Sequence, residues 1–496
     1  MRTEEQQSII DAIVIKKEPL VKVLARAGVG KSHVSIDLVA ELLKTNPDAK
    51  VRYCVYGNAN AAEMTAKFGH TAIVSTLHAL AYHYIIRQKR YNLNKKLNQF
   101  ISWKHIPKTI TIPFGKAPLV IELVNMFCKG TINTYNEFAD SLVTDKPIPQ
   151  SIHKNAKDML LAMQQGKMEI THDFYLKLFH RDVMQGKIQL DQPDLLIADE
   201  FQDANPQLLD IFKAYPAKQK LMLGDDLQSC FRFMGCVNAF KELDAEGTTL
   251  PMTKTFRCNT LLAKKVETFM QKTVEPEMHF EGIDYPEDFK IESRAYITRT
   301  NMELVAYMIK ADVNDTPYRL ISKAKTDQLF KYPLFLLGAK PGTKYYDPNL
   351  KSLQLDVEAY HKSPTLQKKY SSTRSYLLNQ NPDDSDLKAA SQLLGTYKPE
   401  EVITAYNNVE KHRHSQGVQV LTCHTSKGFS FDSVELSKKM ESSIKKAMLA
   451  IALKEELTDD EYDSILLYYI AVTRCRVELI GAYTLENIYN SVKENT

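Results

Sequence analysis

The sequence has no long apolar run and no leader-like start, and on these two absences we expect neither a membrane protein nor a secreted one. No uninterrupted apolar stretch in the 496 residues reaches the ~20 residues that a membrane-spanning helix needs. The first residues, MRTEEQQSIIDAIV, are too polar and acidic for a signal peptide. We therefore expect a cytoplasmic protein with no membrane partner.

Cysteine is scarce and scattered, which argues against a disulfide framework and against a zinc module. The seven cysteines form no CxxC pair and no Cys/His cluster of zinc spacing. They are Cys54, Cys128, Cys230, Cys236, Cys258, Cys423 and Cys475. We predict reduced, mostly buried thiols and no structural zinc.

An excess of charge of one sign is also lacking. Lys and Arg number 64 against 60 acidic residues, and a net charge of +4 is too small to indicate a nucleic-acid partner by itself. The hydrophobic share of 44% and the charged share of 25% are those of an ordinary globular protein. At one domain per ~150 residues, the length predicts three or four structural units.

Strand and helix signals alternate at both ends of the chain. The apolar LVKVLA is followed by a loop and the helical HVSIDLVAELLK, and KVRYCVYG by the helical NANAAEMTAKF. This alternation predicts a parallel sheet with helices on both faces. Basic helical segments interrupt the pattern over residues 85–185. Turn clusters rich in Pro, Tyr, Lys and Ser interrupt it again over 333–399, where we expect an insertion that is partly loop.

A candidate phosphate loop, ARAGVGKS, lies between the first strand and its helix. Such a loop turns backbone N–H groups towards phosphates at a helix N-terminus. Lys31 would reach the β- and γ-phosphates, and the Ser32 hydroxyl would bind Mg²⁺. The other loop residues are Ala25, Arg26, Ala27, Gly28, Val29 and Gly30. The alternative is a tight glycine turn with a surface lysine.

The apolar run LLIADEFQDANP ends in three carboxylates within five positions. Such close carboxylates repel one another unless a cation or a reaction requires them. Asp199 is placed to hold Mg²⁺ and Glu200 to orient and deprotonate water. Together with the phosphate loop, this strand end predicts an NTPase that uses Mg²⁺. The alternative is a solvated acidic turn.

These and further motifs, in this order, resemble superfamily 1 helicases of the UvrD/Rep type. The matching segments are RTEEQQSII, the phosphate loop, VYGNANAAEM, STLHALA, ADEFQDANP, LGDDLQSCFRFMG, TKTFRCN, YITRTN, LTCHTSKGFSFDSV and YYIAVTRCR. The resemblance implies an α/β fold of two RecA-like lobes with parallel sheets, each with an inserted subdomain. It assigns the lobes and insertions as 1–84 with 186–250, insertion 85–185, 251–332 with 400–496, and short insertion 333–399.

The resemblance also implies roles around ATP. Gln6 would read adenine and Phe256 would stack on the base. Gln228 would sense the γ-phosphate, and Arg257 and Arg474 would act on it as arginine fingers. Gly428 would also lie at the nucleotide. Without the other motifs, Phe256 would be read as an ordinary core residue, and Arg257 and Arg474 as members of ordinary salt bridges.

The DNA-contacting positions of the family fall on polar and aromatic residues. They are Asn58, Thr76, His78, Phe231, Phe233, Thr422 and His424. Aromatic platforms with polar groups suit single strands bound without sequence preference. Read singly, each histidine fits a core position equally well.

Three residues depart from the family pattern. Arg26 stands where a small residue is usual, which leaves open a changed loop shape or an added phosphate contact. Met234 replaces an arginine, and Ser430 replaces an acidic residue, and both changes predict slower hydrolysis.

The expected function is an ATP-dependent helicase moving 3'→5' on single-stranded DNA, in replication, repair or recombination. Expected partners are single-stranded DNA, duplex junctions and replication or repair proteins. The chain would act as a monomer or weak dimer, in the host cytoplasm if it is viral. Two alternatives are a translocase that remodels protein–DNA complexes with little unwinding, and an ATP-gated DNA-binding protein with vestigial hydrolysis.

Overall fold

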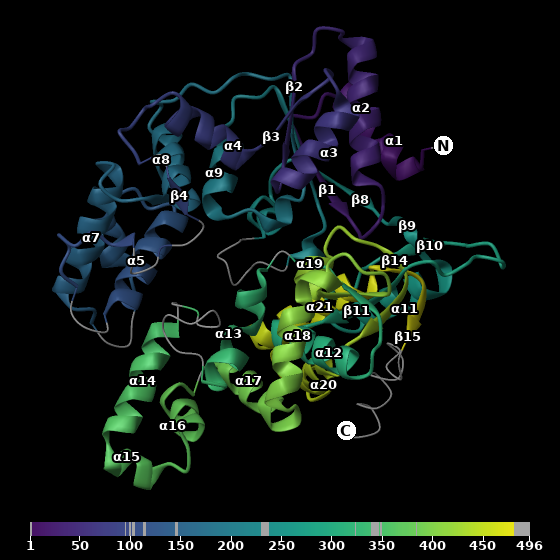
Figure 1. The fold of residues 1–496 in the computed structure, drawn as a ribbon. Helices are drawn as coiled ribbons and strands as arrows, with labels where there is room; N and C mark the ends of the chain where they lie inside the picture. The colour runs from purple at the N-terminus through teal and green to yellow at the C-terminus, as the bar shows by residue number, and fades with distance from the viewer. Residues whose placement is uncertain are drawn as a thin grey trace. The chain divides into compact units, whose positions relative to one another are not determined.

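The computed structural model describes residues 2–94, 96–98, 101, 105–112, 116–143, 147–229, 238–322, 324–338, 347, 350–382 and 384–480. The chain divides into two compact units, Met1–Thr253 and Lys254–Thr496 (Figure 1). Each unit has a parallel sheet of its own, which confirms the predicted α/β class.

Unit 1 is built on a six-stranded parallel sheet. Its order is β3 (Ile73–Thr76), β2 (Val51–Val55), β6 (Leu195–Ala198), β7 (Gln219–Gly224), β1 (Leu20–Ala25) and β8 (Thr248–Met252). Every residue of β2 and β6 is buried, as expected of a parallel sheet covered on both faces.

Alternation along these strands produces two cores. Leu195 and Ile197 pack into the core beneath α1 (Glu4–Ile10), α2 (Lys31–Thr45) and α3 (Asn58–Phe68). Leu196 and Ala198 point to the opposite face and join a second core. That core includes α4 (Leu77–Tyr82), α5 (Ala117–Lys129), α6 (Tyr135–Ser141), α7 (Gln150–Gln164), α8 (His172–Met184), α9 (Pro206–Ala214) and α10 (Ala239–Glu242).

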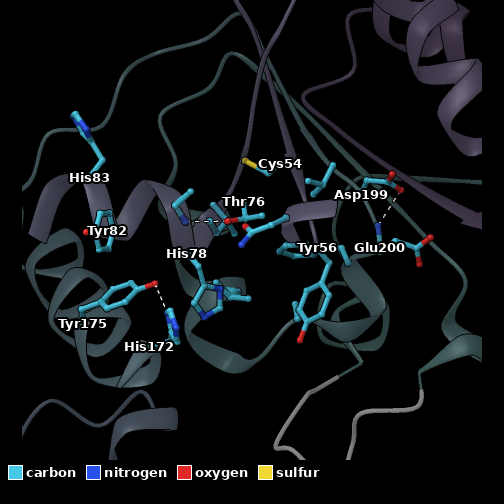
Figure 2. A pocket seen from close by; sticks show the side chains of 18 of the residues that line it. Cys54, Tyr56, Thr76, His78, Tyr82, His83, His172, Tyr175, Asp199 and Glu200 are labelled. Carbon is cyan, nitrogen blue, oxygen red and sulfur yellow. Dashed lines mark hydrogen bonds between the residues drawn. The ribbon is translucent and has the colours of Figure 1, made fainter. Parts of the chain in front are cut away.

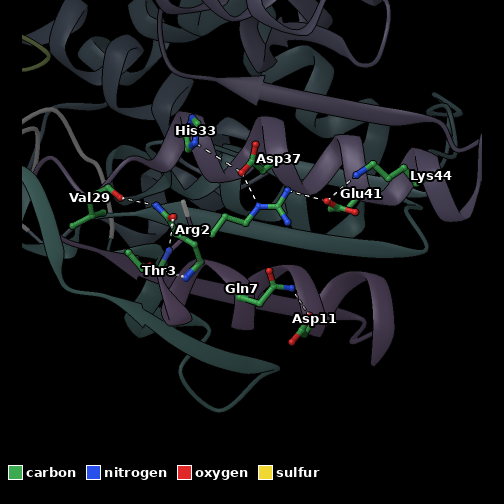
Figure 3. Close-up of polar contacts among 10 residues, drawn as sticks. Arg2, Thr3, Gln7, Asp11, Val29, His33, Asp37, Glu41 and Lys44 are labelled. Atoms are coloured by element: carbon green, nitrogen blue, oxygen red, sulfur yellow. Dashed lines mark hydrogen bonds and ion pairs between the residues drawn. The ribbon is translucent and has the colours of Figure 1, made fainter.

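The start of the chain is fastened to α2. Arg2 Nε donates to Asp37 Oδ2 at 2.8 Å, and Arg2 Nη2 donates to Glu41 Oε1 at 2.9 Å (Figure 3). Lys44 lies 3.1 Å from the same Glu41 oxygen. These partly exposed pairs each contribute little energy, but together they hold the residues just before α1 against α2, the helix that follows the phosphate loop.

Unit 2 contains a five-stranded parallel sheet. Its order is β12 (Tyr318–Leu320), β13 (Val418–Thr422), β11 (Arg294–Thr298), β14 (Phe431–Leu436) and β15 (Cys475–Ile480). A separate parallel pair joins β9 (Lys254–Asn259) to β10 (Glu281–Ile283). The flanking helices are α11 (Thr260–Gln271), α12 (Asn301–Val313), α18 (Pro399–His412), α19 (Cys423–Ser426), α20 (Lys438–Ala452) and α21 (Asp459–Val472).

The described part of 333–399 consists of helices joined by short non-helical segments, and its assignment as an inserted subdomain stays a prediction. Its helices are α13 (Thr326–Leu336), α14 (Lys351–Lys362), α15 (Pro364–Lys369), α16 (Thr373–Gln380) and α17 (Ser385–Thr396). Ser363, Ser372 and Asp384 lie in the breaks between these helices, and each caps the helix that follows by accepting a backbone N–H. Residues that favour turns also favour helix N-termini.

The described cysteines Cys54, Cys128, Cys258, Cys423 and Cys475 are buried free thiols. This confirms the prediction for those five, while Cys230 and Cys236 lie outside the described residues. Among the described helices, none combines the length and the apolar composition that crossing a bilayer requires.

Packing of α13 predicts a stability effect in unit 2. Phe330 is fully buried and shares a core with Leu393 of α17 and Val402 of α18. Phe330→Ala should lower the free energy of unfolding by about 3–5 kcal/mol, because it removes a buried ring and leaves a cavity. Chemical denaturation measures this loss. Leu261→Ala, at a 66% exposed site, is the control and should change stability by less than about 0.5 kcal/mol.

Candidate functional site

The phosphate loop joins the carboxyl end of β1 to α2. Gly28 and Gly30 have φ values of +75° and +84°, a region that L-residues with side chains rarely adopt. Gly30 is the N-cap of α2, so the helix begins at Lys31 with its N-terminal N–H groups beside the loop. Ala25 is the buried last residue of β1. The local shape suits an anion.

Lys31 and Glu200 form the central ion pair of this edge. Lys31 Nζ lies 2.9 Å from Glu200 Oε1, and Gln202 Nε2 donates to Glu200 Oε2 at 2.6 Å. Burial opposes the charge on Lys31, but Glu200, Asp199 and Asp225 outweigh it and raise the pKa of Lys31. The lysine therefore stays protonated.

Glu200 has a left-handed backbone, with φ +55°. This conformation is costly for a residue other than glycine and is concentrated at functional sites. It turns the chain sharply after β6, between Asp199 and the 3-10 helix Phe201–Asp203.

Asp199 lies at the end of β6 and is held from two sides. Tyr53 Oη donates to Asp199 Oδ2 at 2.8 Å, and the Glu200 backbone N–H donates to Asp199 Oδ1 at 2.9 Å. Burial, followed by the charge of Glu200, raises the pKa of Asp199. A buried carboxylate of this kind is stabilised in its charged form by a cation.

The donor set fits Mg²⁺. Asp199 offers a carboxylate and Ser32 a hydroxyl at the start of α2, and Mg²⁺ prefers such oxygen ligands together with phosphate and water. Tyr53 was not found from the sequence, because a tyrosine within a buried strand carries no signal of its contact.

A third charged segment follows β7. Asp225 Oδ2 accepts from Gln228 Nε2 at 2.7 Å, so the predicted γ-phosphate sensor is positioned by a neighbouring carboxylate. Arg26 Nη1 lies 2.7 Å from Asp226 Oδ1 and 3.5 Å from Asp225 Oδ1. Arg26 therefore contacts carboxylates of this segment.

Gln6 lies beside the phosphate loop. Its side-chain oxygen accepts from the Thr3 backbone N–H at 3.1 Å, and its Nε2 donates to the Val29 carbonyl at 3.4 Å. Gln6 is thus both the capping-box residue of α1 and a link to the loop. Its role towards adenine stays a prediction.

A pocket of about 770 Å³ opens at the same carboxyl edge, beside β2, β3 and β6 (Figure 2). It brings together Asn58, Thr76 and His78, three of the predicted DNA contacts of unit 1. Asp199 and Glu200 also line it. Thr76 Oγ1 accepts from the Ala79 N–H at 2.9 Å and so caps α4. Burial lowers the pKa of His78, which favours a neutral ring.

The pocket's other wall comes from α4, the segment that follows it and α8, and its residues were not among the predicted site residues. Tyr82, His83, Arg87, His172 and Tyr175 line it. The His172 ring nitrogen lies 2.9 Å from Tyr175 Oη, and Arg87 lies over the Tyr82 ring at 6.0 Å. Aromatic faces beside a cation are typical of sites for single-stranded nucleic acid. The interleaved aromatic and basic residues near 82–96 were the available signal.

In unit 2, Arg257 and Arg474 lie next to each other. Arg257 Nη1 donates to the Thr473 carbonyl at 3.1 Å, and Arg474 Nε donates to the Ile470 carbonyl at 2.9 Å. Both guanidinium groups therefore meet the C-terminal end of α21, whose dipole favours positive charge. Burial, followed by the charge of Arg474, lowers the pKa of Arg257 to about 9. Phe256, on the same strand, is 44% exposed.

The other predicted residues of unit 2 follow β13. Thr422 Oγ1 caps α19 by accepting from the Thr425 N–H at 3.4 Å, as Thr76 caps α4 in unit 1. His424 is the second residue of that helix and is half-buried. Gly428 has φ +91° and open space where a Cβ would be.

Ser430, where the family pattern has an acidic residue, accepts a hydrogen bond from Arg476 Nη2 at 3.1 Å. Arg476 Nη1 also lies 3.0 Å from Asp432 Oδ1. Phe231, Phe233 and Met234 lie outside the described residues.

Comparison with known proteins finds one family match and relatives that are named as DNA helicases. The family described as an AAA domain matches residues 6–234. The F-box DNA helicase protein 1 of Schizosaccharomyces pombe is 24% identical over 537 aligned residues, covering 98% of this chain and 58% of that protein. The F-box DNA helicase 1 of Gallus gallus is 26% identical over 263 residues, covering 48% of this chain and 24% of that protein. The chain thus spans little more than half of the first relative and a quarter of the second.

The hydrogen bond from Tyr53 to Asp199 predicts a change in metal dependence. Tyr53→Phe removes the hydroxyl that orients the candidate Mg²⁺ ligand, and such outer contacts are worth about 10- to 100-fold in metal affinity. We expect the Mg²⁺ concentration for half-maximal ATP binding to rise by about tenfold. Tyr215→Phe is the control, because Tyr215 donates to Asp191 away from this site. An equal shift in both variants would contradict the assignment.

Proposed function

The chain belongs to the superfamily 1 type of helicase, and on that premise we propose that it is an ATP-dependent DNA helicase moving 3'→5' on single-stranded DNA. One observation carries the proposal. Asp199 and Glu200, the candidates for ATP hydrolysis, line the same pocket as Asn58, Thr76 and His78, the candidates for strand contact. A structural change at the nucleotide can therefore be transmitted to the bound DNA strand through residues of this one pocket.

On the nucleotide side, Lys31 would bind the β- and γ-phosphates, and Asp199 and Ser32 would hold Mg²⁺, which supplies neutralisation of phosphate charge when bound. The ammonium of Lys31 is paired with Glu200 at 2.9 Å. Phosphates would compete for that ammonium, leaving Glu200 to orient the attacking water and accept its proton. ATP binding would thus prepare the base.

On the strand side, the pocket offers rings for base stacking and polar groups for the backbone. Tyr82 provides an aromatic face supported by an edge contact with the buried Tyr175, and Arg87 and His83 provide groups for phosphates. Stacking on rings tolerates every base, which suits a motor that must move along any sequence.

Arg257 and Arg474 are proposed to bind the γ-phosphate as arginine fingers. The structure describes no carboxylate within ion-pair distance of Arg257, and burial lowers its pKa. A cation placed in this way gains much by meeting a phosphate. Phe256 would stack on the base and Gly428 would lie at the nucleotide, while Thr422 and His424 would contact the strand.

The two relatives are named as DNA helicases, which supports DNA as the nucleic acid along which this protein moves. We propose single-stranded DNA and duplex junctions as partners, and a DNA-associated location. Replication, repair or recombination are the processes in which such a motor would act.

ATP hydrolysis with and without single-stranded DNA tests the proposal. The wild type should hydrolyse ATP faster with DNA, and Lys31→Ala and Glu200→Gln should each lower kcat by at least about 100-fold, because they remove the phosphate contact and the base. Lys44→Ala, on the exposed far end of α2, is the matched control and should keep full activity. Hydrolysis that persists in Glu200→Gln would contradict the role of Glu200.

Binding to a labelled oligonucleotide tests the pocket. His78→Ala should weaken binding by about 3- to 10-fold, since it removes one contact of a multi-contact site. His70→Ala, at an exposed histidine outside the pocket, should leave affinity unchanged. Equal affinities of both variants and the wild type would mean that the DNA strand does not bind in this pocket.

A further inference from the structure

Arg26 lies in the phosphate loop but takes no part in the proposed chemistry. Its backbone N–H donates to the Met252 carbonyl at 3.0 Å, which continues the pairing of β1 with β8. Its side chain is buried and leads to the segment after β7. There Nη1 lies 2.7 Å from Asp226 Oδ1 and 3.5 Å from Asp225 Oδ1.

The two carboxylates belong to a tight turn that ends in Gln228. Asp225 is the N-cap of the 3-10 helix Asp226–Gln228, and its Oδ1 accepts from the Leu227 N–H at 3.3 Å. Its Oδ2 accepts from Gln228 Nε2 at 2.7 Å. One oxygen of Asp225 therefore faces Arg26 and the other holds Gln228, with the carboxylate fully buried.

We propose that Arg26 is a positioning residue that fastens the phosphate loop to this turn, so that a shift of the loop on nucleotide binding is transmitted to Gln228. The proposal rests on the proposed ATP hydrolysis only for its kinetic consequence. The physical basis is that a guanidinium can face two carboxylates at once, whereas a lysine ammonium is a point charge. Removing one member of a buried pair leaves the other charge uncompensated.

An alternative role for Arg26 is direct binding of a phosphate. The two roles differ in kinetics. A phosphate ligand acts on ATP already in the ground state, so its loss raises KM. A residue that positions Gln228 acts where Gln228 meets the γ-phosphate during hydrolysis, so its loss lowers kcat.

The first experiment compares Arg26→Gln, Arg26→Lys, Asp226→Asn and the double variant Arg26→Gln/Asp226→Asn in DNA-stimulated ATP hydrolysis. We expect each single variant to lower kcat by about tenfold with KM for ATP changed by less than about threefold. The double variant should be no slower than the slower single variant, because both changes remove one interaction.

Arg90→Gln is the matched control. Arg90 pairs with the buried Asp182 at 2.5 Å, outside the pocket and the phosphate loop. It should lower thermal stability as a broken ion pair does, while kcat stays at the wild-type value. A fall in kcat equal to that of Arg26→Gln would assign the Arg26 effect to general destabilisation and overturn the proposal. A rise in KM with unchanged kcat would overturn it in favour of a phosphate contact.

Hydrogen exchange gives a readout that does not need hydrolysis. In wild-type protein without nucleotide, amides of 225–229 should be protected. Arg26→Gln and Asp226→Asn should each raise their exchange rate by about tenfold, whereas Arg90→Gln should not. Unchanged exchange in both site variants overturns the proposal. A wild type that hydrolyses no ATP contradicts the proposed function alone, and the exchange result still decides whether Arg26 holds the turn.

Discussion

Parallel pairing of β1, β2, β6 and β7 is the constraint on which the candidate site depends. Parallel strands end at the same edge of a sheet, so everything that follows their carboxyl ends must converge there. β1 leads to the phosphate loop, β6 to Asp199 and Glu200, and β7 to Asp225. β2 leads to Asn58 at the start of α3. The nucleotide residues and the pocket are neighbours for this reason.

Convergence concentrates negative charge, and the two cations of the phosphate loop balance it. Lys31 pairs with Glu200, and Arg26 pairs with Asp226 and Asp225. Carboxylates this close would otherwise be protonated or repel one another. In the proposed cycle these cations do different work. Lys31 exchanges its carboxylate for phosphate, whereas Arg26 keeps its carboxylates and moves them with the loop.

Local patterns in the sequence predicted the strands, the phosphate loop and the acidic strand end, because glycine turns and apolar runs are readable within a few residues. The partners of those residues could not be predicted in this way. Tyr53 and Asp199 are 146 positions apart, and Arg26 and Asp226 are 200 apart. Only the register of the sheet brings them together. The turn-favouring residues of 333–399 mark the breaks between its helices, because a serine or aspartate in such a break also caps the helix that follows.

Directed movement along DNA is the central claim, and translocation kinetics on end-labelled oligonucleotides of increasing length test it most directly. A 3'→5' motor should reach a label at the 5' end after a delay that grows linearly with length and requires ATP, with no such delay for a 3' label. Arrival times that do not depend on length at either end would contradict movement, and leave ATP-gated binding to DNA in its place.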